Sequence, residues 1–163
     1  PTRRSSDLFV TGDARLRIQK APDASFSLII LDAFGADAVP VHLLSREAIR
    51  LYLTKLAPGG LLVFNITNGY LDLESVIGLQ ARDAGLPCRV RRDVHVTPEE
   101  RRAGKFGSIW AVLGRAEADL GRLGDDPRWL IPRARDGARP WTDDYSDLAS
   151  YLLILRPRPS DRS

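Results

Sequence analysis

Two aspartates that follow a short apolar run, Asp32 and Asp37, are the residues of this sequence best suited to a reaction site. The run over residues 26–31 has no helical period, which is typical of a central strand buried on both faces of a parallel sheet. Ligands of open α/β sheets bind at the carboxyl ends of strands, where a carboxylate can accept a proton or bind a cation. We therefore predict a site at Asp32. A capping role for Asp32 and a solvated Asp37 are the alternative interpretations.

Two further positions carry polar residues where a ligand could bind. Asp13 precedes a helix expected over residues 14–21, so it could cap that helix or bind a ligand. Asp143, Asp144 and Tyr145 lie between a tryptophan and an apolar run, which fits a segment that folds back over the sheet edge. Acidic residues are also favourable at the start of a helix, so this segment has a purely structural interpretation as well.

The histidines and the cysteine do not form a metal-binding pattern. His42 could face the site, but a lone histidine is more often a surface or packing residue. His95 alternates with apolar neighbours and is interpreted as structural. Cys88 is interpreted as a small buried hydrophobic residue. Because no cluster of His, Cys and carboxylate residues has ligand spacing, we predict no metal site.

The composition indicates one globular domain. The chain has 163 residues, of which 44% are hydrophobic, enough to form a core. No apolar run approaches the roughly 20 residues that span a bilayer. The single cysteine agrees with a reducing compartment, so we expect a cytoplasmic domain with no membrane segment in this chain. The net charge of +3 comes from arginines without interleaved aromatic residues, so no nucleic-acid partner is predicted.

The order of the expected elements indicates an α/β fold. Helical periodicity, apolar runs and turn residues predict helices over 14–21, 46–56 and 72–84, and strands over 26–31, 61–66, 88–96 and 108–113. This order is typical of a mostly parallel, nucleotide-binding sheet with an antiparallel last strand. The sequence contains no glycine-rich loop such as G-x-G-x-x-G, so we expect the N-terminal half of such a domain to be missing.

We expect the chain to be a fragment of a longer protein. It contains no methionine, not even at position 1. Residues 1–8 are interpreted as a possible non-native leader, residues 9–155 as a truncated domain and residues 156–163 as a frayed tail.

Four short motifs resemble those of the spermidine synthase family. They are Gly12-Asp13-Ala14, the run FSLIILDAF, LAPGG at 56–60 and GKFGSIWAVL at 104–113. The resemblance covers residues 9–155, which correspond to the second half of the family's domain. The bacterial variety that it resembles is sometimes fused behind membrane helices. The resemblance implies a Rossmann-like class I methyltransferase fold. In the intact parent it implies aminopropyl transfer from decarboxylated S-adenosylmethionine to a di- or polyamine.

The resemblance also implies roles for single residues. Asp13 and Ala14 would bind the adenine ring of the co-substrate, and Asp32 would be the general base for the attacking amine. Four residues would bind the amine substrate: Asp37, Asp143, Asp144 and Tyr145. The sulfonium of the co-substrate already activates the carbon, so the protein need only orient the amine and keep it deprotonated. Carboxylates can do both.

Three functions remain open from the sequence. The first is aminopropyl transfer to a small-molecule amine, with decarboxylated S-adenosylmethionine or S-adenosylmethionine as co-substrate and no metal. The second is an S-adenosylmethionine-dependent methyltransferase on the same fold. The third is a catalytically silent binding domain. The separation between Asp32 and Asp37 supports this third function, because it differs from the separation of the two acids in the family that the chain resembles. We further expect a homodimer as a possible assembly, and we expect the fragment by itself to be inactive.

Overall fold

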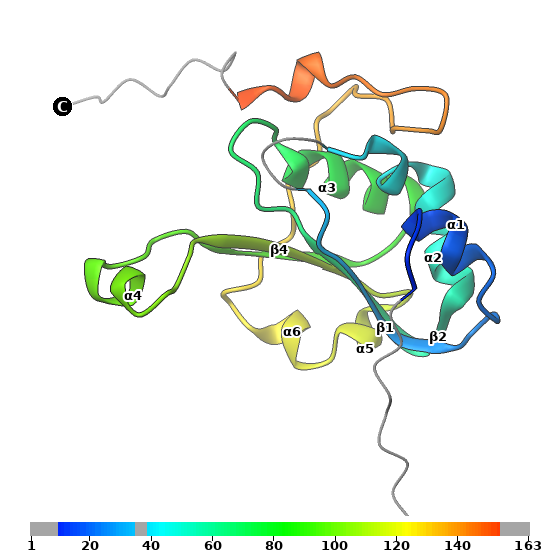
Figure 1. The fold of residues 1–163 in the computed structure, drawn as a ribbon, viewed down its shortest axis with the longest axis horizontal. Helices are drawn as coiled ribbons and strands as arrows, with labels where there is room; N and C mark the ends of the chain where they lie inside the picture. Colours follow the sequence, from blue (N-terminus) through cyan, green and yellow to red (C-terminus); the bar gives the residue numbers. More distant parts are fainter. Residues whose placement is uncertain (1–9, 35–38, 154–163) are drawn as a thin grey trace, which may run out of the picture.

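A four-stranded sheet runs through the residues that the computed structural model describes, 10–34 and 39–153 (Figure 1). In spatial order its strands are β1 (Phe26–Leu31), β2 (Leu56–Asn65), β4 (Ser108–Leu113) and β3 (Cys88–Asp93). β1 and β2 run parallel, and β4 is antiparallel to both of its neighbours, so β3 points the same way as β1 and β2. The predicted mostly parallel sheet with an antiparallel last strand is therefore confirmed.

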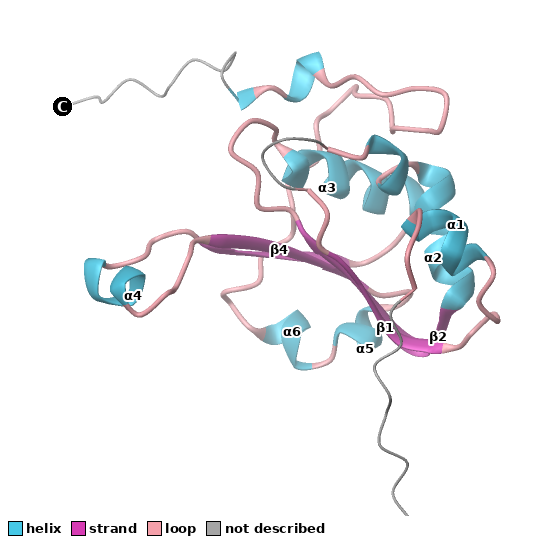
Figure 2. Cartoon of the chain, in the orientation of Figure 1, coloured by secondary structure: helices cyan, strands magenta, loops and turns pink. Residues whose placement is uncertain are grey.

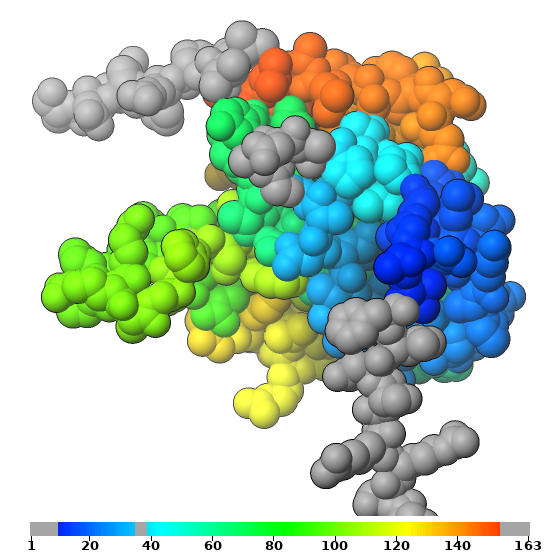
Figure 3. All heavy atoms as spheres, in the orientation of Figure 1, coloured from blue at the N-terminus to red at the C-terminus, as the bar shows by residue number. Residues whose placement is uncertain are grey.

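Helices lie on both faces of this sheet (Figure 2). One face carries α1 (Ala14–Gln19), α2 (Arg46–Lys55) and α3 (Leu73–Ala84), and the other carries the short helices α5 (Glu117–Leu120) and α6 (Arg122–Asp125). Another short helix, α4 (Pro98–Arg102), lies in the arm between β3 and β4, which projects from the body of the molecule (Figure 3). Among the described residues, no helix is long and apolar enough to cross a membrane.

The core lies between the sheet and the two long helices. In β2, Leu62 and Phe64 are fully buried and Val63 is half-buried, which is the two-residue period of a pleated strand. The helices contribute Ile49 from α2 and Ile77 from α3, both almost completely buried. The face of the sheet that bears Leu62 and Phe64 is therefore the one that these helices cover.

The structure corrects the prediction that the strand over residues 26–31 is central and buried on both faces. Among the described strands β1 lies at the edge of the sheet and pairs only with β2. Ile29 and Leu31 face the core, whereas Leu28 is 49% and Ile30 is 55% exposed. A continuous apolar run fits two covered faces, but the long helices described here cover only one face of β1.

The second strand begins earlier than predicted, at Leu56 rather than at residue 61. Residues Pro58, Gly59 and Gly60, which follow the helix predicted over 46–56, form an irregularity inside β2, where its register with β1 shifts. Gly59 has a φ of 72°, which favours glycine, and a side chain on Gly60 would come within 3.1 Å of the carbonyl oxygen of Phe26.

The chain after residue 140 packs against the helical layer as a C-terminal segment (residues 141–153). The carbonyl oxygen of Trp141 accepts a hydrogen bond of 2.8 Å from Nε2 of Gln80 in α3. Further along, the carbonyl oxygen of Tyr151 accepts a hydrogen bond of 2.9 Å from the backbone N–H of Asp72. The C-terminal segment is therefore fixed at both ends to α3 and to the loop after β2.

Candidate functional site

Two neighbouring parallel strands end in polar side chains that contact each other. Asp32 follows β1, and its Oδ1 accepts a hydrogen bond of 2.9 Å from Nδ2 of Asn65, the last residue of β2. The register explains the contact, because Leu31 pairs with Phe64 and the next residue of each strand lies at the same edge. The structure therefore places Asp32 at the carboxyl end of the sheet, next to an amide that the sequence prediction did not assign to the site.

Asn65 is itself held by the loop that follows β2. Its Oδ1 accepts hydrogen bonds from the backbone N–H of Thr67, at 3.1 Å, and from the Thr67 hydroxyl, at 2.6 Å. The same hydroxyl oxygen accepts a hydrogen bond of 2.8 Å from the backbone N–H of Ile109 in β4. The chain of contacts fixes the amide with its N–H donors directed to Asp32, because its oxygen is already used.

The loop after β1 is anchored as well. Asn68 donates a hydrogen bond of 3.1 Å from Nδ2 to the carbonyl oxygen of Phe34. Phe34 is 2% exposed, and its ring lies 6.3 Å, centroid to centroid, from that of Phe64. These contacts hold the start of the loop against the core, with Asp32 exposed above it.

The described contacts of Asp32 leave half of its carboxylate available. Asn65 contacts Oδ1, and no hydrogen bond to Oδ2 comes from any residue the structure describes. An exposed carboxylate oxygen at a strand end can accept a proton or a hydrogen bond from a ligand amine. The second predicted acid, Asp37, lies outside the described residues.

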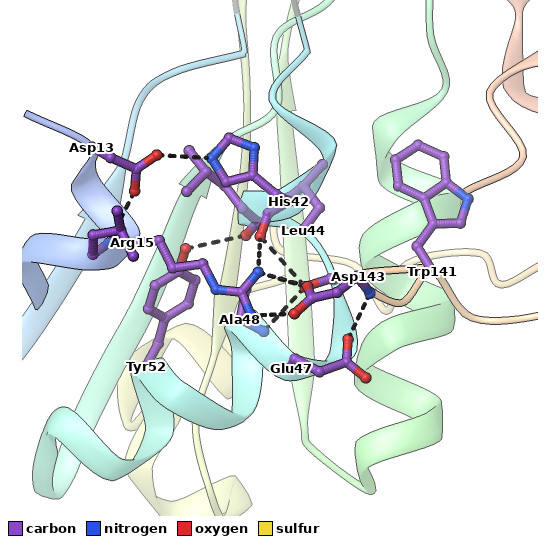
Figure 4. A network of polar contacts seen from close by, with 12 residues as sticks. Asp13, Arg15, His42, Leu44, Glu47, Ala48, Tyr52, Trp141 and Asp143 are labelled. Atoms are coloured by element: carbon purple, nitrogen blue, oxygen red, sulfur yellow. Dashed lines mark hydrogen bonds and ion pairs between the residues drawn. The ribbon is translucent and has the colours of Figure 1, made fainter. Parts of the chain in front are cut away.

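The structure shows Asp13 as the cap of α1. Its Oδ1 accepts a hydrogen bond of 2.9 Å from the backbone N–H of Leu16, and this bond lowers the pKa of Asp13. Its Oδ2 lies 3.5 Å from Nε2 of His42 (Figure 4). The capping interpretation that the sequence left open is confirmed. Ala14 is the first residue of the helix, and ligand binding by either residue stays a prediction.

Asp143 is joined to two helices by a polar network (Figure 4). Its two carboxylate oxygens each accept a hydrogen bond of 2.6 Å from the guanidinium of Arg15 in α1, and Oδ1 also accepts one of 2.5 Å from the hydroxyl of Ser45. The backbone N–H of Asp143 donates to Oε2 of Glu47 at 2.9 Å. Arg15 holds the pKa of this carboxyl below its usual value. Asp143 thus fastens the C-terminal segment to the beginnings of α1 and α2.

The other two residues of the predicted segment have different surroundings. Asp144 is exposed. Tyr145 lies under the guanidinium of Arg139, which is 4.5 Å from the centre of its ring. Hydrogen bonds and an ion pair link Asp13, His42, Arg15 and Asp143 into one network. Among the described residues, no hydrogen bond or ion pair joins this network to Asp32. The signal that could have identified Asn65 was a polar residue at the carboxyl end of a buried apolar strand, much as Asp32 follows β1.

Among residues 10–34 and 39–153, no group of three or more His, Cys, Asp or Glu side chains could hold a metal ion. Cys88 is buried, as predicted, and burial raises the pKa of its thiol to about 12. The described part of the site at Asp32 presents a carboxylate, an amide and a hydroxyl group.

Comparisons with known proteins give a likeness of fold. Neither a family model nor a curated protein sequence matches the chain. Among solved structures the chain is similar to a crystal structure of a probable spermidine synthase from Corynebacterium glutamicum, with 21% sequence identity and a TM-score of 0.56. The match covers 85% of this chain but 55% of that chain. At this identity the likeness shows the fold alone: a Rossmann-like α/β fold of the methyltransferase type, similar to that of a spermidine synthase-like protein.

Proposed function

We propose that the edge of the sheet at Asp32 is the amine site of an aminopropyl transfer from decarboxylated S-adenosylmethionine to a di- or polyamine. The observation that carries this proposal is the carboxylate of Asp32, oriented by Asn65 where two parallel strands end. The fold shared with a probable spermidine synthase supports it. Because this chain spans 55% of that chain, the activity is proposed for the gene product that contains this sequence.

In this mechanism Asp32 accepts the proton that the attacking amine loses. The amine nitrogen bonds to the carbon beside the sulfonium, the bond from that carbon to sulfur breaks, and its electron pair remains on sulfur in a neutral thioether. Oδ2 of Asp32 is the oxygen that would take the proton, since Asn65 contacts Oδ1. The base therefore acts from a fixed orientation. Orienting the reacting groups is a large source of rate acceleration in a displacement of this kind.

The binding roles follow the same proposal. Asp13 and Ala14 would bind the adenine ring at the start of α1, with Oδ2 of Asp13 exchanging its contact with His42 for the adenine amino group. Asp37, Asp144 and Tyr145 would contact the amine substrate. Asp143 would contribute to the amine site only after release from Arg15, because both of its oxygens contact that guanidinium.

The substitution Asp32→Asn tests the catalytic role. Asparagine keeps the shape of the side chain but cannot accept the proton, so kcat should fall by roughly a hundredfold or more with little change in the affinity for the co-substrate. The gene product that contains this chain would be assayed with putrescine and spermidine against both adenosyl donors, with products separated by chromatography. Asp125→Asn, an exposed acid of α6, is the matched control and should leave turnover unchanged.

Two results would replace this proposal. Unchanged turnover in Asp32→Asn would remove Asp32 from the reaction. Transfer of a methyl group to an acceptor, without an aminopropyl product, would establish the methyltransferase alternative on the same fold.

A further inference from the structure

A second place in the molecule has the features of a binding site, and Tyr145 is the one residue that it shares with those discussed for the reaction. A cavity of about 320 Å³ opens between the turn at residues 135–139 and the C-terminal segment. Its lining includes two arginines, two tyrosines and two acids: Arg135, Arg139, Tyr145, Tyr151, Asp136 and Asp147. Its volume falls at the lower end of the range for small-molecule sites.

Each arginine is held by a tyrosine ring. The guanidinium of Arg139 lies 4.5 Å from the ring centre of Tyr145, and that of Arg135 lies 5.3 Å from the ring centre of Tyr151. Arg135 also donates a hydrogen bond to the carbonyl oxygen of Ser150. No hydrogen bond or ion pair to Arg139 comes from any residue that the structure describes. Because Arg139 contacts the face of the Tyr145 ring, the N–H donors of its guanidinium are free for another acceptor.

The acids of the cavity have partners of their own. Asp136 forms an ion pair of 3.1 Å with Arg82. Asp147 accepts a hydrogen bond of 3.1 Å from the backbone N–H of Ser150. Neither acid forms an ion pair with Arg139 among the described residues, so the positive charge of Arg139 is available to a ligand.

The hydroxyl of Tyr151, a residue that lines the cavity, lacks an acceptor among the described residues. The residue is 2% exposed, and its hydroxyl oxygen is buried without a hydrogen-bond partner among the described residues. A buried hydroxyl without a partner costs free energy, so such groups are usually satisfied. Burial raises the pKa of Tyr151, opposed by Arg135. The phenol therefore stays a neutral donor near that guanidinium.

We propose that this cavity binds a small oxyanion, a carboxylate or phosphate group, held by Arg139 and Arg135 with the hydroxyl of Tyr151 as a further donor. Guanidinium groups suit such ligands because their planar N–H donors match two oxygens at once. The proposal goes beyond aminopropyl transfer, since it uses none of the residues at the Asp32 edge.

Calorimetric titration of the 163-residue chain with inorganic phosphate and with acetate, at ionic strength matched with chloride, tests the site. At least one anion should bind with saturation. Arg139→Gln should weaken that binding by about tenfold, the effect of losing one charge-assisted contact. Arg50→Gln removes the same charge from an exposed position on α2 that does not line the cavity, and it should have no effect.

A second variant separates binding from folding. Tyr151→Phe deletes only the unpaired hydroxyl, so it should weaken anion binding severalfold without lowering the melting temperature. Tighter binding of inorganic phosphate would assign a phosphate group to the ligand, and tighter binding of acetate would assign a carboxylate group. Absence of saturable binding by either anion, or equal binding by the parent chain and Arg139→Gln, would overturn the proposal.

Discussion

At Asp32, one amide determines how the carboxylate is presented to a ligand. Asn65 donates to Oδ1 of Asp32 and accepts two hydrogen bonds from Thr67, so it cannot rotate without breaking contacts on both sides. The position of Asp32 could be predicted from the sequence, because the rule for strand ends needs only the apolar run before it. The contact with Asn65 could not, because it depends on which strands become neighbours.

Substitution of Asn65 should therefore act through the orientation of Asp32. We expect Asn65→Ala to lower kcat by about tenfold while the Michaelis constant for the amine changes less, since a positioning contact matters most in the transition state. Steady-state kinetics over a range of amine concentrations measure both constants. Asp125→Asn, in an exposed acid of α6 on the other face of the sheet, is the control and should change neither constant. An increase in the Michaelis constant alone would assign Asn65 to substrate binding instead.

Among the elements, β1 shows the limit of what apolar patterns can predict. The bounds of β1 and β4 agree with the prediction, since both are short apolar runs between turn residues. The prediction that β1 is buried on both faces was wrong, because an apolar run does not indicate which of its faces a helix will cover. The predicted start of β2 was wrong because Pro58 and Gly59 are typical of a helix end. In the structure they form an irregularity within β2, which still pairs with β1 on both sides of it.

Adjacent isoleucines in β1 should differ sharply in their effect on stability. Ile29 is 7% exposed in the core, whereas Ile30 is 55% exposed on the opposite face. We expect Ile29→Thr to lower the free energy of unfolding by about 2 kcal/mol or more and Ile30→Thr by less than about 0.5 kcal/mol. Urea denaturation of the two variants provides the comparison. Equal losses would mean that both faces of β1 are covered in solution.

For the whole molecule, the network at Asp143 joins the two ends of the described chain. Arg15 and Asp143 are 128 residues apart in the sequence, and Ser45 and Asp143 are 98 apart. No local pattern predicts such contacts, because each side chain would also fit a solvated surface. The sequence did indicate a segment that folds back here, because three polar residues lie between Trp141 and an apolar run. The burial of Trp141 came only from the structure.

The Asp143 network should make stability depend on pH at the acidic end. The pKa of Asp143 is lower in the folded chain than its ordinary value of 3.8, mainly because of Arg15. The contribution is therefore complete above about pH 4 and is lost as the pH falls through the folded-state pKa. Asp143→Asn should lower the melting temperature by roughly 2 °C at pH 7, since a partly exposed ion pair contributes little.

The difference in melting temperature between the parent chain and Asp143→Asn should become smaller as the pH is lowered to 2.5. Thermal melting followed by circular dichroism measures it. Asp144→Asn, a change in an exposed neighbour, should melt like the parent chain at every pH. A gap between Asp143→Asn and the parent that stays constant with pH would show that the carboxylate charge does not stabilise the fold.

The separation of Arg15 from Asp143 also affects how the protein is made. During translation Arg15 and Ser45 leave the ribosome long before Asp143 is synthesised, so α1 and α2 emerge without the side chain that joins them. Contacts this distant in sequence form late, after the local helices and the pairing of β1 with β2. A nascent chain that stalls before residue 141 would also lack Trp141, and would leave Gln80 without that carbonyl acceptor. Such a stalled chain would expose buried surface of α2 and α3 to chaperones and proteases.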